Sequence, residues 1–242
     1  MTKKVINQNT KLNQELINTI EPKFIFADKP INRFNILETK NGTLQTNQTN
    51  KEELLKNLKD QINSIENCKL KENSNKIILG EGNINSPLML IGEAPGSEEE
   101  KLGVPFRGEV GELLNKMLIA INIKRQNIYT SYAINFRPPD DRKPTSTEIK
   151  RYSVFLKEHI SIINPKIIVL MGSSAMEAVT GISEKITTER GHWKEVILKN
   201  KTFPLMITFN PSYLIRFPEN KKHSWEDLKK IRDKIKDLNL KF

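Results

Sequence analysis

The chain has 242 residues, a formal net charge of +10 and a single cysteine. One cysteine cannot form an intramolecular disulfide or supply a cysteine-only zinc site, which excludes disulfide-stapled and zinc-ribbon scaffolds. No apolar run reaches the roughly 18 residues that cross a bilayer, and the N-terminus lacks the apolar segment of a secretory signal. We therefore expect a soluble, cytoplasmic protein with no membrane partner, and the positive charge favours an anionic partner such as nucleic acid.

The first 50 residues differ in composition from the remainder of the chain. They are rich in asparagine and glutamine and show little sustained apolar periodicity, which is typical of linker sequence. We expect residues 1–50 to form a polar arm, partly disordered or loosely docked, and residues 51–242 to form one domain. At about 150 residues per domain, the length suits one substantial domain with additional material.

Apolar strands and helices alternate after Lys51. Apolar residues at helical spacing predict a helix starting near Lys51 and further helices over 113–121, 145–163 and 225–238. Thr145 and Glu148 have the spacing of a capping box at the start of one of them. Short apolar runs predict strands at 76–79, 88–91, 128–134, 167–171, 193–198 and 205–209. This alternation predicts an α/β fold with a largely parallel sheet and helices on both faces.

Three loops follow predicted strands, where an open α/β sheet binds its ligands. The first runs from Gly92 to Gly108, and its glycines and proline predict a tight turn whose backbone N–H groups can hold a carbonyl or an anion. It is not a phosphate-binding P-loop, because the Gly-Lys-Ser/Thr ending is missing. An ordinary turn, with Glu98–Glu100 as a solvated face, is the alternative interpretation.

The second loop, residues 135–144, carries Arg137, Arg142 and Lys143 on a proline-stiffened segment. Such a loop holds cations in place at low entropic cost and suits contact with phosphates. The alternative is a rigid connection whose charges are solvated.

The third loop, residues 208–216, combines polar groups with an apolar wedge and then a cation. The wedge is Tyr213-Leu214-Ile215, and Arg216 follows it. A wedge beside a phosphate clamp is what the extrusion of a base from a duplex requires. The alternative is that Leu214 and Ile215 belong to the core.

Taken in this order, the loops resemble the uracil-DNA glycosylase superfamily, most closely its family-four branch. The matching segments are Gly92-Glu93-Ala94-Pro95-Gly96, then 103–114, then 137–144, and finally Pro211-Ser212-Tyr213-Leu214-Ile215-Arg216. The resemblance runs from about Lys51 to Leu238. It implies a three-layer α/β/α sandwich with a central, mainly parallel four-stranded sheet.

The resemblance implies a repair enzyme that flips uracil out of DNA and hydrolyses its N-glycosidic bond. No metal is needed, because fixed hydrogen-bond donors stabilise the leaving uracil anion. The base would be held by the first loop, with Phe106 stacked on it. The residues assigned to the base pocket are Gly92, Ala94, Pro95, Gly96, Phe106 and Tyr132. Those assigned to DNA are Arg137, Arg142, Ser212, Tyr213, Leu214 and Arg216.

The sequence departs from the family at its iron–sulfur site. The family-four branch binds a 4Fe–4S cluster through four cysteines, and only Cys68 lies in a matching region. Phe136 and Tyr152 stand near the places where other cluster cysteines are expected. We therefore predict that the chain binds no cluster and that packing fills the gap.

Further departures lie close to the chemistry. Tyr132 replaces an asparagine that reads the uracil edge, and its hydroxyl cannot reproduce the paired donor and acceptor of an amide. Asn210 replaces a histidine and is assigned to the base carbonyl. Asp141 either orients and activates water or pairs with Arg142 or Lys143. Glu93 is a polar contact to the base or a solvated surface residue. The candidate catalytic residues are thus Glu93, Asp141 and Asn210.

Our leading hypothesis is a cluster-free, monomeric glycosylase acting on uracil in DNA. The substitutions in the pocket keep two alternatives open. One is a DNA-binding homologue that has lost the chemistry, and the other is a glycosylase with altered base specificity.

Overall fold

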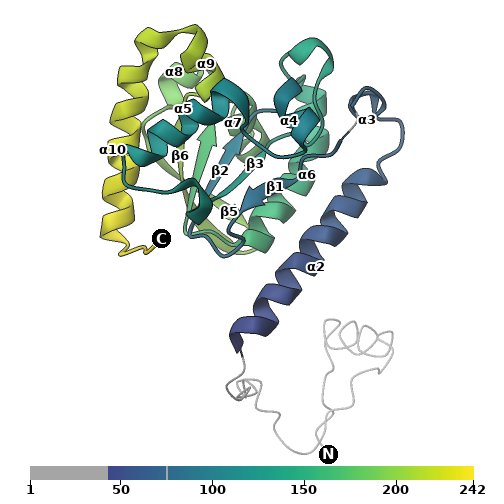
Figure 1. Ribbon diagram of the computed structural model, residues 1–242, viewed down its shortest axis with the longest axis horizontal. Helices are drawn as coiled ribbons and strands as arrows, with labels where there is room; N and C mark the ends of the chain where they lie inside the picture. The colour runs from purple at the N-terminus through teal and green to yellow at the C-terminus, as the bar shows by residue number, and fades with distance from the viewer. Residues whose placement is uncertain (1–42, 75) are drawn as a thin grey trace, which may run out of the picture. The chain divides into compact units, whose positions relative to one another are not determined.

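The structure is a computed structural model that describes residues 43–74 and 76–242 (Figure 1). Residues 1–42, most of the predicted polar arm, lie outside the described residues. Thr43–Phe242 forms one compact unit. Its first helix, α2 (Thr43–Asn63), begins well before Lys51, so the last residues assigned to the arm are helical. Within the described residues, no helix is both long and apolar enough to pass through a membrane.

The elements follow the predicted alternation. The helices after α2 are α3 (Lys69–Glu72), α4 (Ser97–Leu102), α5 (Gly108–Ile119), α6 (Ser146–Ile163), α7 (Ser173–Thr180), α8 (Ile186–Glu189), α9 (Pro211–Arg216) and α10 (Lys221–Asp237). The strands are β1 (Gly80–Gly82), β2 (Leu88–Gly92), β3 (Tyr129–Tyr132), β4 (Ile167–Met171), β5 (Trp193–Leu198) and β6 (Lys201–Thr208). Short 3-10 turns span Arg125–Asn127, Pro139–Asp141 and Pro218–Asn220.

In the described part of the chain, the strands form one six-stranded sheet in the order β1-β3-β2-β4-β6-β5. The four central strands run parallel to one another, and the edge strands β1 and β5 pair antiparallel to their neighbours. The predicted α/β class is confirmed. The predicted four-stranded parallel sheet corresponds to the centre of this larger mixed sheet.

One predicted strand is displaced. The apolar run 76–79 is not a strand; the ladder begins at Gly80, where β1 pairs with β3. Ile78 is fully buried and donates its N–H to the Asn135 carbonyl at 2.8 Å. The apolar run therefore marks burial in the core, while the neighbouring glycines supply the strand pairing.

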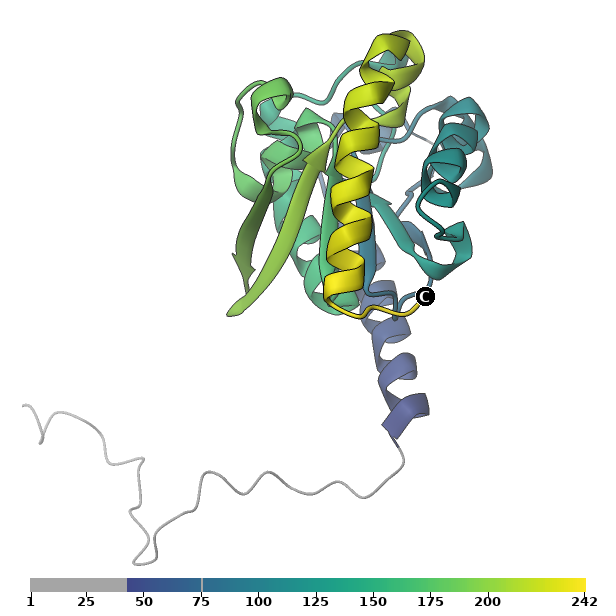
Figure 2. The same cartoon turned by 90° about the vertical axis from the view of Figure 1, so that its left-hand side faces the viewer.

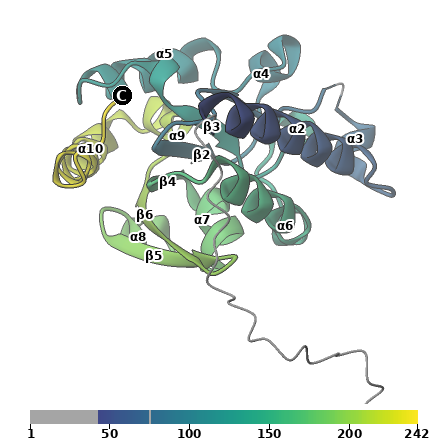
Figure 3. The same cartoon turned by 90° about the horizontal axis from the view of Figure 1, so that it is seen from below.

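Helices cover both faces of the sheet and make the three layers of the sandwich. Figure 3 shows α2, α6 and α7 on one side and α5 and α10 on the other, and Figure 2 shows α10 lying along its face. Side chains of β2 alternate between the two cores: Met89 and Ile91 pack with α6 and α7, whereas Leu88 and Leu90 pack with α5 and α10. Period-two alternation in a strand buried on both sides produces this arrangement.

Helix α6 begins at the capping box that the sequence predicts. Thr145 caps α6 by accepting a hydrogen bond from the Glu148 N–H, and the Glu148 carboxylate accepts one from the Thr145 N–H. Asn164 ends the helix in the left-handed conformation, directly before Pro165. This helix holds the end of the second predicted loop in place, which matters for the site below.

Candidate functional site

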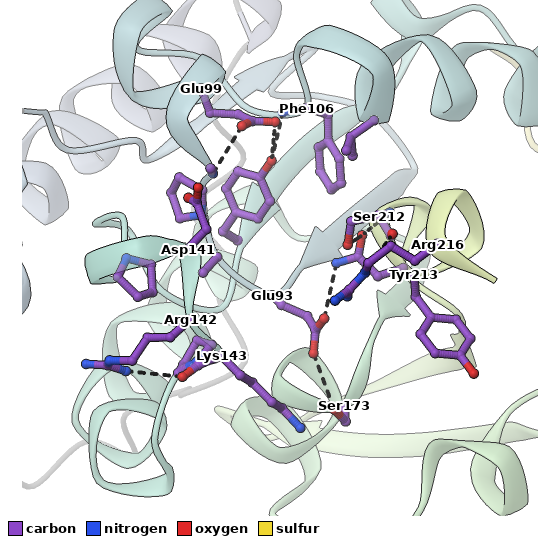
Figure 4. Close-up of a pocket in the computed structure, with 18 of the residues that line it drawn as sticks. Glu93, Glu99, Phe106, Asp141, Arg142, Lys143, Ser173, Ser212, Tyr213 and Arg216 are labelled. Carbon is purple, nitrogen blue, oxygen red and sulfur yellow. Dashed lines mark hydrogen bonds between the residues drawn. The ribbon is translucent and has the colours of Figure 1, made fainter.

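A cavity of about 600 Å³ opens where the parallel strands end (Figure 4). All three loops singled out from the sequence contribute to its wall. The predicted site residues that line it are Glu93, Ala94, Pro95, Gly96, Phe106, Tyr132, Asp141, Arg142, Asn210, Ser212, Tyr213 and Arg216. Gly92, Arg137 and Leu214 lie outside that lining. The convergence of loops at the carboxyl edge of the sheet is the arrangement expected of a ligand site in this class of fold.

Gly92 lies at the end of β2, beneath two aromatic rings. A Cβ at this position would stand 2.7 Å from ring atoms of both Phe106 and Tyr132. The glycine therefore contributes to the pocket by letting the rings approach the backbone, although its own atoms do not line the cavity.

Glu93 is held by hydrogen bonds and is not a solvated surface residue. Its Oε1 accepts bonds from the Ser174 N–H and hydroxyl, both at 3.0 Å, and from the Ser173 hydroxyl at 3.3 Å. Its Oε2 accepts a longer bond of 3.4 Å from the Asn210 amide. Figure 4 shows the carboxylate between the loop after β4 and the start of α9. A half-buried carboxylate with this set of donors is held in a fixed orientation, from which it can contact a ligand in the cavity.

Tyr132 fills one side of the pocket and is only 3% exposed. Its hydroxyl accepts the Phe106 N–H at 2.9 Å and donates to Glu99 Oε1 at 3.2 Å. The Tyr132 and Phe106 rings lie 4.8 Å apart at 30°. Burial, and after it the Glu99 carboxylate, raises the pKa of Tyr132 well above its usual range, so the hydroxyl keeps its proton. Tyr132 therefore presents a ring to the cavity while its polar atom is already engaged.

Glu99 is a buried carboxylate that the sequence did not single out. It is 5% exposed, and besides Tyr132 it accepts the N–H groups of Gly96 at 3.0 Å and Arg107 at 2.9 Å. These bonds close the first loop onto the start of α5. The alternative interpretation of Glu98–Glu100 as a solvated face therefore does not hold for Glu99, which the backbone donors of the loop satisfy inside the protein, or for Glu100, which is 12% exposed and bound by Arg137.

The second loop pairs its own charges. Arg137 binds Asp141 with two hydrogen bonds, Nε to Oδ1 at 2.7 Å and Nη2 to Oδ2 at 3.0 Å, and its Nη1 reaches Glu100 at 3.2 Å. The expected pairing of Asp141 with Arg142 or Lys143 is therefore corrected to Arg137. Asp140 and Asp141 both adopt left-handed φ angles, of 55° and 52°, and the chain curls back so that the Asp141 carboxylate meets Arg137.

Arg142 is engaged in the same way. Its guanidinium makes two bonds to Glu148, of 2.9 and 2.7 Å, at the first turn of α6. In contrast, among the described residues no ion pair joins Lys143 or Arg216 to a carboxylate. Figure 4 shows both of these side chains at the pocket. Of the cations that line the cavity, Lys143 and Arg216 are thus the ones without a carboxylate partner in the part of the chain that the structure describes, and they are the candidates for a phosphate contact.

The Arg142–Glu148 pair predicts an acid-sensitive contribution to stability. Hydrogen bonds from Arg142 lower the pKa of Glu148 to about 2, below its ordinary 4.5. The pair therefore stabilises the fold fully above about pH 4.5 and loses that effect as the pH falls toward 2. We expect Glu148→Gln, which can still cap α6, to lower the free energy of unfolding by about 1 kcal/mol at neutral pH and by nothing measurable at about pH 2.

Urea unfolding of both proteins across this pH range measures the difference. Glu112→Gln, on the exposed side of α5, is the matched control and should follow the native protein at every pH. A gap between Glu148→Gln and the native protein that does not change with pH would contradict the assignment of the effect to this ion pair.

The third loop forms the helix α9. Asn210 caps it by accepting the Ser212 N–H and hydroxyl, both at 3.1 Å, which directs its amide N–H toward Glu93. Leu214 is 1% exposed and packs in the core beneath α5 and α10. Leu214 is therefore a core residue and not part of a wedge that enters DNA, because the helical period of α9 turns its side chain inward. The Tyr213 ring stacks on Phe209 at 5.0 Å and lies tilted against Phe217 at 4.8 Å, beside the cavity.

Comparisons with known proteins agree with this site. A family described as the uracil DNA glycosylase superfamily matches residues 79–229, the stretch that carries the cavity. The chain belongs to the uracil-DNA glycosylase superfamily. It is similar to the type-4 uracil-DNA glycosylase of Thermotoga maritima, at 35% identity over 77% of this chain and 97% of that protein. Similar type-4 enzymes of Sulfurisphaera tokodaii and Archaeoglobus fulgidus are 34% and 28% identical, over 84% and 92% of their lengths.

The iron–sulfur cluster implied by the family-four resemblance does not fit the side chains of this superfamily member. The Cys68 sulfur lies 3.2 Å from the Tyr152 hydroxyl, inside a core that also holds Phe136. Burial raises the pKa of Tyr152 above its usual range, so it is a neutral phenol. Cluster iron is held by thiolates, and one cysteine beside aromatic rings does not provide them. In the described part of the chain, no group of three or more His, Cys, Asp or Glu side chains is placed to hold a metal ion.

Sequence reasoning missed the loop after β4, which this superfamily member brings to the cavity with the other three. Gly172, Ser173 and Ser174 follow a buried strand directly, and this position alone marks them as candidates. They were passed over because the segment has neither charge nor aromatic residues. Glu99 was missed for the opposite reason, since a run of three glutamates is typical of solvent-facing sequence.

Proposed function

We propose that the chain is a DNA repair glycosylase that hydrolyses the bond between uracil and deoxyribose. The observation that carries the proposal is the fixed Glu93 carboxylate in a cavity walled by Phe106, at the edge of the sheet where the superfamily match lies. The type-4 relatives are named for this activity, and they align with most of the chain.

In the proposed reaction, the flipped base lies against Phe106 with its carbonyl edge toward the loop after β2. The glycosidic C–N bond breaks, and its electron pair leaves with uracil as an anion. A water molecule oriented by Glu93 forms the new C–O bond at the sugar, and its proton passes to the carboxylate. The Asn210 amide, which donates to Glu93 and has a second N–H, donates to the base carbonyl as negative charge develops there.

Both Asp141 oxygens are bound to Arg137, and this supports a role for Asp141 in holding the second loop in shape. The alternative, activation of water by Asp141, would require this ion pair to open. Glu93 is therefore the carboxylate to which we assign the chemistry.

The proposal is tested by the release of uracil from a labelled oligonucleotide, detected as alkali-labile strand scission. We expect scission with uracil and none with cytosine or thymine at the same position. The absence of scission on single- and double-stranded substrates at high enzyme concentration would favour the DNA-binding homologue without chemistry. Salt-sensitive binding alone, without scission, would be its signature.

Contact with DNA is assigned to Lys143 and Arg216, which line the cavity together with Ser212 and Tyr213. We expect Lys143→Gln to weaken binding to all DNA sequences equally. The slope of log K against log salt should become shallower by about 0.9, the value for one phosphate contact on duplex DNA. Fluorescence anisotropy over a series of salt concentrations measures it.

Lys150→Gln is the matched control for this substitution, because Lys150 is an exposed lysine on α6 outside the cavity lining. It should leave the slope unchanged. Equal slopes for the native protein and Lys143→Gln would remove Lys143 from the interface.

We further propose that the chain folds and acts without an iron–sulfur cluster. Cys68, Phe136 and Tyr152 pack against one another where the family-four resemblance implies cluster ligands, and this packing supports the proposal. We expect the purified protein to contain no stoichiometric iron and to show no visible absorption band. Its melting temperature and uracil release should not respond to an iron chelator. Iron bound at one cluster per chain, or a fall in melting temperature on chelation, would contradict it.

The monomeric state and the cytoplasmic location remain predictions from the sequence. Action on DNA follows from the proposed activity, and size-exclusion chromatography with light scattering tests the monomer.

A further inference from the structure

The loop after β4 carries the residues Gly172, Ser173 and Ser174, to which the proposed reaction assigns no role. All three lie against the Glu93 side chain. They come from a different strand than Glu93, and β2 and β4 are neighbours in the sheet. The contact therefore joins two loops that are distant in the sequence, since Glu93 and Ser174 are 81 residues apart.

Ser174 makes the most complete contact. Its side chain is 0% exposed, and both its N–H and its hydroxyl donate to the same carboxylate oxygen, Glu93 Oε1, at 3.0 Å. The Ser173 hydroxyl adds a third bond to that oxygen at 3.3 Å. A carboxylate oxygen has two lone-pair sites, so three donors saturate Oε1.

Gly172 allows the carboxylate to approach so closely. Its φ is +104°, and a Cβ there would stand 2.4 Å from Glu93 Cδ. Any other residue at 172 would meet both an unfavourable backbone conformation and the glutamate side chain. The Gly172 backbone and the two serines thus form a close-fitting binding site for Glu93 Oε1.

The other carboxylate oxygen is left for the substrate. Among the described residues, the donor recorded for Glu93 Oε2 is the Asn210 amide, at the long distance of 3.4 Å. A weakly bound oxygen can accept a new bond from water, whereas a saturated one cannot. The two carboxylate oxygens therefore differ in role: hydrogen bonds hold Oε1 in place, and Oε2 can accept a bond from the reacting water.

We infer that Ser174 is the positioning residue for Glu93: it anchors Oε1 so that Oε2 faces the reacting water. The inference rests on the proposed function, because Glu93 is the carboxylate assigned to the chemistry there. Ser174 is fully buried and does not line the cavity, so it is not placed to touch the base or the sugar. Its effect on the reaction passes through the orientation of Glu93, and a small misplacement of a catalytic group has a large effect on rate.

The test uses single-turnover uracil release by the full chain. We expect Ser174→Ala, which removes one of the three donors to Oε1 and leaves the Ser174 N–H and the Ser173 hydroxyl, to slow the chemical step by roughly 10-fold, below the ~100-fold cost of misplacing a catalytic group by about 1 Å. Its affinity for abasic or uncleaved DNA should stay within about twofold, since the substitution leaves the lining cations in place. Ser161→Ala, which removes a hydroxyl bonded to the Lys157 carbonyl on α6, is the matched control and should change neither quantity. A native rate in Ser174→Ala, or a loss of DNA affinity in proportion to the loss of rate, would overturn the inference.

A double-mutant cycle separates positioning from general damage to the fold. In a Glu93→Ala background, Ser174→Ala should slow the residual reaction by less than about twofold, because the group it positions is already gone. Multiplication of the two losses would show that Ser174 acts by another route and would overturn the inference.

The same cycle distinguishes failure of the inference from failure of the proposed function. If the native chain releases no uracil, the proposed function fails, and the urea midpoints of the four proteins still report on the contact. A shift caused by Ser174→Ala that largely disappears in the Glu93→Ala background would confirm the contact as an interacting pair. Midpoint shifts that simply add would show that Ser174 and Glu93 do not interact, and would overturn the inference.

Discussion

Replacing Glu93 by glutamine is expected to slow uracil release by about 1,000-fold, within the range measured for loss of a general base. The substituted amide has nearly the same shape and can still accept bonds from Ser174, so the loop should keep its conformation. It cannot take a proton from water. Because the loss concerns the transition state, the affinity for uracil-containing DNA should stay within about twofold, and the fall should appear in kcat with KM little changed.

Single-turnover kinetics and anisotropy measure these two quantities separately. Glu98→Gln is the matched control on the same loop, because Glu98 is exposed and pairs with Lys101 at the surface. It should be indistinguishable from the native protein. A Glu93→Gln protein with native rates would show that another group activates the water, and would direct attention to Asp141.

Replacing Tyr132 by asparagine is expected to destabilise the protein and to improve its use of uracil. The tyrosine is buried, stacks on Phe106 and satisfies the Phe106 N–H, so the smaller side chain should lower the free energy of unfolding by about 3 kcal/mol. The new amide offers a donor and an acceptor to the edge of the base. One added hydrogen bond of about 1.4 kcal/mol in the transition state corresponds to an approximately tenfold gain in kcat/KM.

Tyr132→Phe separates the two effects of that substitution. It keeps the ring, leaves the Phe106 N–H and Glu99 without the hydroxyl, and should cost about 1 to 2 kcal/mol in stability with no gain in activity. Uracil release by Tyr132→Asn that is no faster than release by Tyr132→Phe would show that the tyrosine does not limit base recognition. Release of other deaminated bases by the native protein, tested in parallel, would support altered specificity.

The positions of the site loops could be predicted from the sequence, and most of their contacts could not. Buried parallel strands have a strong local signature, and the runs ending at Gly92 and Met171 give their strand ends to within one residue. The carboxyl edge of the sheet then follows from topology alone. The capping box at Thr145 is equally local, because both partners lie within one helical turn.

Contacts between elements distant in the sequence were not accessible in this way. The partners of Arg137 and Arg142 depend on how the second loop curls, which the left-handed conformations at Asp140 and Asp141 decide. The burial of Glu99 depends on backbone donors from Gly96 and Arg107 that exist only once the first loop has closed. Leu214 was assigned to DNA because the motif suggested a wedge, whereas its neighbours in α5 and α10 place it in the core.

Arg137 pairs with Asp141 and Glu100, so this cluster contributes nothing to the positive excess of +10 that attracts DNA. An arginine that already faces its own carboxylates holds no mobile anion in solution. Moving it onto a phosphate would release the counterions of that phosphate but would leave Asp141 and Glu100 unneutralised beside the DNA, and their repulsion would offset the gain. Such a residue adds little to the free energy of association, and it contributes instead to selecting DNA of the right shape. It can engage a phosphate only where the strand's path matches the position of the guanidinium closely enough to displace Asp141.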